Sequence, residues 1–217
     1  NGWHGLDAFE TPWNLIFGMA VFFLSRLLGG LYFINNIDND TIRMRSRRQL
    51  ITDAIPFLVF FLGYMGNTLS KDGFAVNPET MEVYMEPYKY FNNLVEMPYI
   101  LVLFLLGVVG VLYGVIKSIM VSSFRRGIWY SGIGTVLTAL SLLLVAGYNN
   151  TAYYPSNADI QSSLTLSNSC SSLFTLKTMA YVSILVPFVL AYIAYAWRAI
   201  DRKSISEEEI KRDEHTY

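Results

Sequence analysis

The sequence has little charge, a single cysteine, two histidines and none of the short motifs that mark soluble enzymes. Charged residues make up 15% of the 217 residues and hydrophobic residues 53%, whereas a soluble domain usually carries about 25% charge. The net charge of −1 gives no basic excess for binding nucleic acid, so we expect no nucleic-acid partner. The lone Cys170 excludes an intrachain disulfide and a thiolate metal site.

Motifs for chemistry within the chain are also absent. The sequence has no phosphate-binding Walker loop, dinucleotide fingerprint, HExxH zinc motif or nucleophile elbow. Both histidines, His4 and His215, lie outside the long apolar runs, so we expect neither to hold a haem or a metal inside a membrane. Methionine can ligate haem iron, but eight methionines in so apolar a chain are better explained as packing residues. We therefore predict no catalytic residue, cofactor-binding residue or metal ligand in this chain.

The missing charge is concentrated in five long apolar runs. Each run is close to the ~20 residues that a helix needs to cross the roughly 30 Å hydrocarbon core of a bilayer. Unbroken apolar runs favour helices over the alternating strands of a membrane barrel. The fold class predicted is therefore all-α, a polytopic membrane helix bundle. Its transmembrane helices are Asn14–Ile34, Leu50–Gly66, Pro98–Ser118, Ile128–Tyr148 and Thr178–Trp197.

Lysine and arginine predict the orientation of these spans. Twelve of them fall in the connection after the first span, the connection after the third span and the tail, against three on the opposite side. Cytoplasmic segments carry the excess of positive charge, so the chain is expected to start outside and end inside. The cytoplasmic set is Arg43, Arg45, Arg47, Arg48, Lys117, Arg125, Arg126, Arg198, Arg202, Lys203, Lys211 and Arg212, and the outer set is Lys71, Lys89 and Lys177.

The connections divide the chain into a single membrane domain, residues 1–217, with two outer loops and a tail. The loops, 67–97 and 149–177, are rich in turn-forming residues and should form ordered caps. In the cytoplasmic tail, 198–217, Ser206 and Glu209 have the capping-box spacing of a polar helix, but we favour a solvated, frayed extension because the tail is charged and lacks apolar periodicity. Because the chain begins at Asn1 and shows no signal peptide, we expect it to be a fragment of a longer protein.

Three charged residues lie in or beside the predicted spans. Arg26, about 12 positions into the first span, should face protein or water because a central arginine costs roughly 2.5–3.5 kcal/mol. It could pair with a quinone, a haem propionate or a buried carboxylate, or it could lie on a proton path. We favour an arginine that is capped by backbone carbonyls, because no carboxylate is apparent at the same depth. Asp53 and Glu96 could carry protons, but we favour charges placed at helix starts. These three are the candidate site residues.

Small residues predict where helices can approach one another closely. Gly110 and Gly114 have GxxxG spacing in the third span, and Ser25 and Gly29 have the same spacing in the first. Such spacing is common in membrane bundles and indicates packing rather than a particular function.

Three stretches resemble subunit II of the cytochrome bd quinol oxidases. The first span and its exit, NLIFGMAVFFLSRLLGGLYFINNID, are similar to the middle of that subunit. The stretch GYNNTAYYPS…QSSLTLSNSCSSLFTLKTM resembles its last periplasmic loop, and YVSILVPFVLAYIAYAWRAI resembles its last helix. The resemblance extends over essentially the whole chain and is to the versions found in Bacteroidetes-type bacteria. The family has eight spans, and five spans that end inside match its fourth to eighth.

The resemblance implies a subunit of a respiratory complex in the bacterial inner membrane that oxidises quinol and reduces O2 to water. It places haem b and haem d in subunit I and gives subunit II a supporting role, so no cofactor is expected on this segment alone. The partners implied are subunit I, membrane lipid and quinone, with a small third subunit left open. The last four spans would form one four-helix bundle, with the first beside it.

Two other functions stay open from the sequence. Arg26 and the prolines Pro56 and Pro187 inside predicted spans are also features of secondary transporters, although paired broken helices and a polar midplane cluster are missing. The other alternative is a purely structural subunit that organises assembly or binds lipid.

Overall fold

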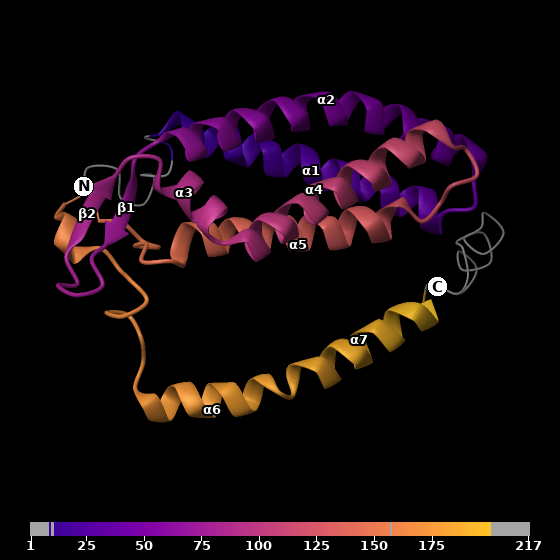
Figure 1. The fold of residues 1–217 in the computed structure, drawn as a ribbon. Coiled ribbons are helices and arrows are strands. Elements are labelled where there is room, and N and C mark those ends of the chain that lie inside the picture. Colours follow the sequence, from indigo (N-terminus) through magenta and orange to yellow (C-terminus); the bar gives the residue numbers. More distant parts are fainter. Residues whose placement is uncertain (1–8, 10, 157, 201–217) are drawn as a thin grey trace.

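The computed structural model describes residue 9, residues 11–156 and residues 158–200. It is predominantly helical, and five helical segments are long and apolar enough to cross a membrane (Figure 1). In chain order the elements are α1 (Pro12–Asn36), α2 (Asp40–Ser70), β1 (Gly73–Val76), β2 (Val83–Glu86), α3 (Lys89–Glu96), α4 (Pro98–Met120), α5 (Gly127–Gly147), the 3₁₀ helix η2 (Ile160–Ser162), α6 (Leu173–Ser183) and α7 (Val186–Ile200). The all-α membrane fold predicted from hydropathy is confirmed.

The helices α1 and α2 form an antiparallel hairpin. Pro12 opens α1 at a position where its missing N–H is not needed. Asn39 caps α2 by accepting a hydrogen bond from the amide of Ile42 at 3.1 Å. Because α2 begins at Asp40, it extends ten residues before the predicted span at Leu50. The hairpin buries an apolar core in which Leu27, Leu31 and Leu50 are almost fully covered.

The helices α4 and α5 form a second antiparallel hairpin that is held together by small residues. The Ser131 hydroxyl donates a hydrogen bond across the interface to the carbonyl oxygen of Val111 at 3.0 Å. A Cβ added to Gly134 would lie 2.5 Å from the carbonyl oxygen of Gly107, so the two backbones are nearly in contact there. The small-residue spacing in the third span correctly indicated close packing. The spacing at Ser25 and Gly29 did not, because space around Gly29 is open.

The connection from α2 to α4 and the connection from α5 to α6 fold into one cap over the same end of the helices. The strands β1 and β2 pair in antiparallel register, with Phe74 opposite Met85. The second connection joins this hairpin, because the amide of Ala152 donates to the carbonyl oxygen of Phe74 at 2.9 Å. Short α3 then packs its buried face on α4 and α5, through Leu94 among others. These connections are ordered caps, with strand pairing that turn composition did not reveal.

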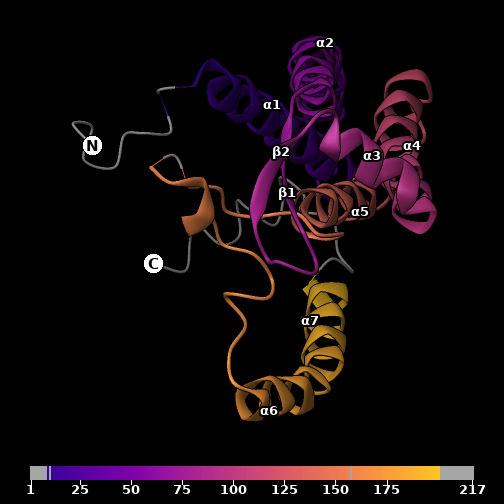
Figure 2. The same cartoon turned by 60° about the vertical axis from the view of Figure 1, so that its left-hand side comes forward.

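The fifth span is broken and stands apart from the other four. The helices α6 and α7 are separated at Ile184 and Leu185. Pro187 has no N–H to donate to the preceding turn, and this explains why the helix stops there. Pro56, by contrast, lies inside a continuous α2 that packs along α1. No residue of the fifth span's most apolar window is buried, and Figures 1 and 2 show α6 and α7 away from the bundle.

The grouping of the spans therefore differs from the sequence prediction. That prediction placed the last four spans, from 50–66 to 178–197, in one four-helix bundle. In the structure, α1, α2, α4 and α5 contact one another, and α6 and α7 contact each other but do not join them. The physical reason is that α1 fills the place beside α2 and α4 with buried Leu27, Leu31 and Ile34. The long connection after α5 is tied into the cap at residues 150–152 and then leaves it away from the other helices.

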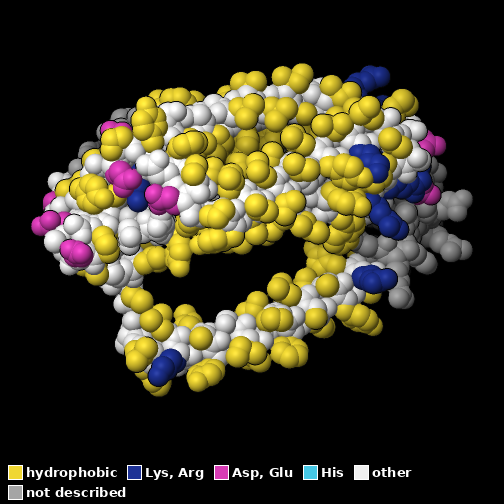
Figure 3. Space-filling model, in the orientation of Figure 1, with side chains coloured by type: hydrophobic (Ala, Val, Ile, Leu, Met, Phe, Trp, Pro, Cys, Tyr) yellow, Lys and Arg dark blue, Asp and Glu magenta, His cyan; other side chains and the backbone are white. Residues whose placement is uncertain are grey.

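Charge divides the two ends of the bundle. Figure 3 shows most lysines and arginines gathered where α2 begins and where α4 connects to α5, and it shows several acidic side chains at the capped end. Some of these arginines also join elements. The Arg47 guanidinium donates from Nε to the carbonyl oxygen of Ser118 at 3.0 Å and also to that of Ser122, at the end of α4. Arg43 pairs with Asp38 at 3.0 Å.

Candidate functional site

The structure joins two of the three candidate charges in an ion pair between α1 and α2. The Arg26 Nε lies 3.1 Å from each carboxylate oxygen of Asp53. The Asp53 side chain is 2% exposed, and the Arg26 side chain is 43% exposed. The carboxylate therefore depends on its protein partners, whereas the arginine keeps an open side.

Two further contacts hold this pair. The Gln49 Nε2, one turn before Asp53 on α2, donates to Oδ1 of Asp53 at 3.0 Å. The Arg26 guanidinium carbon also lies 5.7 Å from the ring centroid of Phe22, within cation–π range. An ionised carboxylate is an acceptor only, so donors from Arg26 and Gln49 are the partners that it needs when buried. The arrangement keeps opposite charges together in the apolar interior.

Sequence reasoning missed this pair because it misplaced the depth of Asp53. The prediction started the second span at Leu50 and so placed Asp53 in the first turn of that helix. The structure starts α2 at Asp40 and places Asp53 roughly 20 Å along the helix at 1.5 Å per residue. A signal was present, because Arg26 and Asp53 lie at nearly equal distances along the chain from Asn39, where the two helices meet. Neither the helix-start interpretation of Asp53 nor a backbone-capped Arg26 fits this geometry.

An open groove of about 440 Å³ lies beside the ion pair. It runs along the α1–α2 seam from the basic end of the bundle to Asp53. Residues of both helices line it, and the polar or small ones are Arg26, Gly29, Gly30, Arg45, Ser46, Gln49 and Asp53. The groove therefore combines positive charge, hydrogen-bond donors and an apolar wall.

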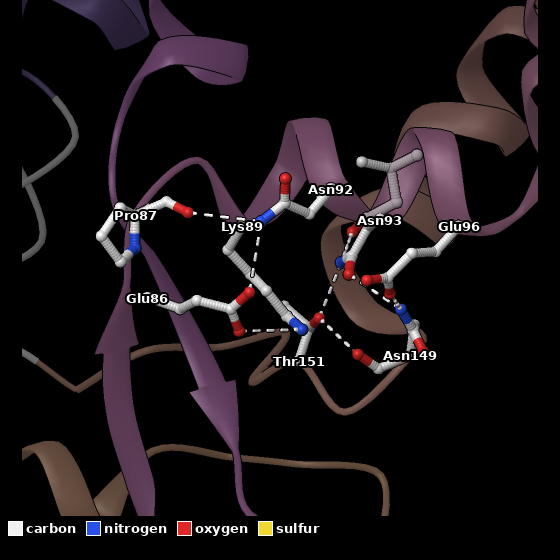
Figure 4. Close-up of polar contacts among 9 residues, drawn as sticks. Glu86, Pro87, Lys89, Asn92, Asn93, Glu96, Asn149 and Thr151 are labelled. Carbon is white, nitrogen blue, oxygen red and sulfur yellow. Dashed lines mark hydrogen bonds and ion pairs between the residues drawn. The ribbon is translucent and has the colours of Figure 1, made fainter.

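Glu96 lies at the other end of the molecule and does not join the pair. It ends α3, and its carboxylate accepts a hydrogen bond from Nδ2 of Asn149 at 2.6 Å (Figure 4). Glu96 therefore belongs to the cap formed by β1, β2, α3 and the second connection, away from the ion pair. Among the candidate residues, only Arg26 and Asp53 contact each other.

Asn93 organises the cap and was not singled out from the sequence. Its side chain is fully buried, and Nδ2 donates to the carbonyl oxygen of Val145 at 2.9 Å and to the Thr151 hydroxyl at 2.8 Å. Its Oδ1 accepts from Asn149 at 3.1 Å (Figure 4). Asn93 therefore ties α3, the end of α5 and the second connection together. In the sequence, an asparagine with this role looks the same as any other asparagine on an amphipathic helix.

Asn93→Ala should lower the free energy of unfolding by about 2–3 kcal/mol, because the partners of a fully buried amide lose their hydrogen bonds. The midpoint of thermal unfolding of the detergent-purified protein would measure this. Asn92→Ala is the matched control, because the side chain of Asn92 makes only longer contacts to Glu86 and Pro87, at 3.3 and 3.4 Å. Equal effects of the two changes would contradict the assigned role of Asn93.

Burial also affects two ionisable groups in the cap. The Lys71 Nζ lies 5.2 Å from the ring centroid of Tyr90. Burial lowers the pKa of Lys71 below its ordinary value, because the charged ammonium loses water. Burial also raises the pKa of the Tyr90 phenol, because its charged form is the anion. Tyr90 is 7% exposed, so water is largely excluded from its ring where α2 ends against α3.

The described residues hold no group of three or more histidine, cysteine or acidic side chains that could bind a metal. His4 and His215 lie outside the described residues. The described residues contain no histidine, but they contain cysteine, methionine and tyrosine, which can also ligate haem iron.

Comparison with known proteins adds the family. The model of the family "Cytochrome bd terminal oxidase subunit II" matches residues 2–200. The chain belongs to this family. Its relatives include the cytochrome bd-I ubiquinol oxidase subunit 2 of Escherichia coli K12 and that of Escherichia coli O157:H7. Each is 29% identical over 220 aligned residues that cover 95% of this chain and 56% of the relative.

The chain thus spans about half the length of these subunit 2 proteins. Membership in the subunit II family agrees with the resemblance found in the first span, the second outer loop and the last span. It also agrees with the five membrane-crossing segments of the structure.

Proposed function

We propose that this chain is part of subunit II of a respiratory bd-type quinol oxidase in the bacterial inner membrane. In this proposal it supports a haem-bearing partner, subunit I, while the complex oxidises quinol and reduces O2 to water. The observation that carries the proposal is the subunit II family match across residues 2–200, which includes all five apolar segments. The substrate class is supported by the relatives, which are subunits of a ubiquinol oxidase.

The supporting role follows from what the chain offers chemically. Its described residues provide tightly packed helix pairs and large exposed apolar surfaces, including the whole of α6 and α7. Such surfaces suit lipid and a membrane partner. The haems, when bound in the complex, would supply the electron transfer and the O2 chemistry. The residues of this chain would exclude water and hold the partner in place.

The proposed orientation puts the basic end of the bundle in the cytoplasm and the cap of β1, β2 and α3 in the periplasm. Its support is the clustering of arginine and lysine at one end (Figure 3). The N-terminal end of this segment would then be periplasmic and its tail, 198–217, cytoplasmic. Labelling of single cysteines introduced at Arg48 and at Glu79 in a Cys170→Ser background, with a membrane-impermeant reagent in intact cells, tests this. Labelling at position 48 but not at position 79 would contradict the orientation.

The functional test is to purify the native complex through a tag on this chain and to record reduced-minus-oxidised spectra. We expect haem b and haem d bands to co-purify, together with quinol-dependent O2 consumption. A complex without haem bands that instead catalyses substrate counterflow in vesicles would contradict the oxidase proposal and favour a transporter. A mock purification from untagged cells controls for carry-over of other oxidases.

A further inference from the structure

We propose that the groove between α1 and α2 binds the phosphate of an anionic phospholipid at the basic end of the bundle. The groove follows one stripe on each helix, so its walls are regular and continuous. On α1 the stripe includes Arg26 and Gly29, and on α2 it includes Arg45, Gln49 and Asp53. These spacings of three and four residues put each set on a single helix face.

The charges of the groove favour an anion. Arg26 and Asp53 neutralise each other, and Arg45 adds a positive charge that makes the lining positive overall. Within the described residues, the polar contacts of Arg26 are made by Nε, so its terminal nitrogens remain available on the exposed side. Arg45 is exposed. Basic pockets between membrane helices near a bilayer surface are the places where anionic lipid headgroups bind.

The shape of the groove favours a lipid over a free anion. Phe33 and Ile42 line the groove together with the charged residues, and both are exposed. Phe33 and Ile42 lie near the basic ends of the helices, so they would contact the headgroup of a lipid whose phosphate binds Arg45. The acyl chains would then run inward along the groove, past Gly29, and a free phosphate would leave this inner part of the groove empty. Gly29 supplies the space, because a Cβ added there meets no atom within 4 Å.

The test uses the full-length protein in its purified complex, reconstituted in nanodiscs. Two photo-crosslinking probes carry the same diazirine acyl chain, one on phosphatidylglycerol and one on phosphatidylcholine. Mass spectrometry then quantifies crosslinks to residues 26–53. We expect severalfold more crosslinking with phosphatidylglycerol. Arg45→Gln should reduce that preference about fivefold, the equivalent of losing one basic contact near a membrane surface.

Matched variants separate binding in the groove from general effects of charge and volume. Arg48→Gln removes an exposed arginine of the same helix that does not line the groove, so the preference should persist. Gly29→Leu should block the groove, whereas Gly18→Leu adds the same volume to α1 at another open position outside it. Both leucine variants meet open space, so neither should prevent folding.

Three results would overturn the proposal. The first is equal crosslinking by the two lipids in residues 26–53. The second is a preference that Arg48→Gln or Gly18→Leu lowers as much as the groove variants do. The third is an absence of lipid crosslinks to residues 26–53 while the same probes label other apolar segments of the chain, which would show that the groove is closed to lipid. The lipid comparison needs no haem signal, so its outcome is independent of the oxidase proposal.

Discussion

Arg26→Ala should destabilise the protein by about 2–4 kcal/mol and lower its assembly into the membrane complex. The change leaves the Asp53 carboxylate, 2% exposed, without its cationic partner. Removing one member of a buried ion pair is costly because the remaining charge stays desolvated. The steady-state amount of the chain in membranes and the thermal unfolding midpoint of the purified complex both measure the loss. In the proposed oxidase, haem retention per subunit should fall in parallel.

The two members of the pair should not respond equally. Asp53→Ala leaves an arginine that is 43% exposed and can turn toward the groove, so the loss should be smaller. Arg26→Ala combined with Asp53→Asn should recover much of the stability, because the uncompensated charge is gone. If the double variant were no more stable than Arg26→Ala alone, the ion pair would not be the cause. Unchanged assembly and turnover in Arg26→Ala would likewise show that the ion pair does not stabilise the protein.

Gly134→Ala should separate α4 from α5 and destabilise the bundle by about 3 kcal/mol. A Cβ at this position would lie 2.5 Å from the carbonyl oxygen of Gly107 and 2.6 Å from the amide nitrogen of Val111. Backbone atoms cannot rotate away as side chains do, so the helices must move apart. The hydrogen bond from Ser131 to Val111 would then lengthen or break. The loss of thermal stability of the purified protein measures the effect.

Gly132→Ala is the internal control for this prediction. It lies on the same helix, and a Cβ added there meets no atom within 4 Å. Alanine is also a better helix former than glycine, by about 0.5–1 kcal/mol in a helix interior. Gly132→Ala should therefore be neutral or slightly stabilising. Similar losses in the two variants would show that helix propensity or insertion, rather than close packing, accounts for the result.

The membrane-crossing segments could be predicted from the sequence because transfer into hydrocarbon depends on local composition. The long uncharged stretches correspond to α1, α2, α4, α5 and the pair α6–α7. The clustering of arginines before and after these stretches likewise needed no tertiary information. Helix ends were less accurate. The start of α2 at Asp40 depends on the cap at Asn39. The first ten residues of α2 are rich in charge, and a hydropathy pattern assigns such residues to a loop.

The candidate site was predicted only as separate residues. Arg26 and Asp53 were identified as unusual charges, but their contact depends on how two helices rotate and align, and local pattern does not contain this. Asn93 was missed for the same reason, because its partners Val145 and Thr151 are more than fifty positions away. Long-range polar contacts of this kind exist only after the helices have packed.

The sequence by itself determined that this chain crosses a membrane in five segments, which of their ends are basic and which family it resembles. Each of these follows from the free energy of placing local stretches in hydrocarbon or water, or from the order of residues. Only the tertiary structure decided which spans pack together, that Asp53 meets Arg26, and that a positive groove opens beside them. Those features depend on the depth and facing of side chains from distant segments, because a buried charge is stable only where a partner from another helix reaches it.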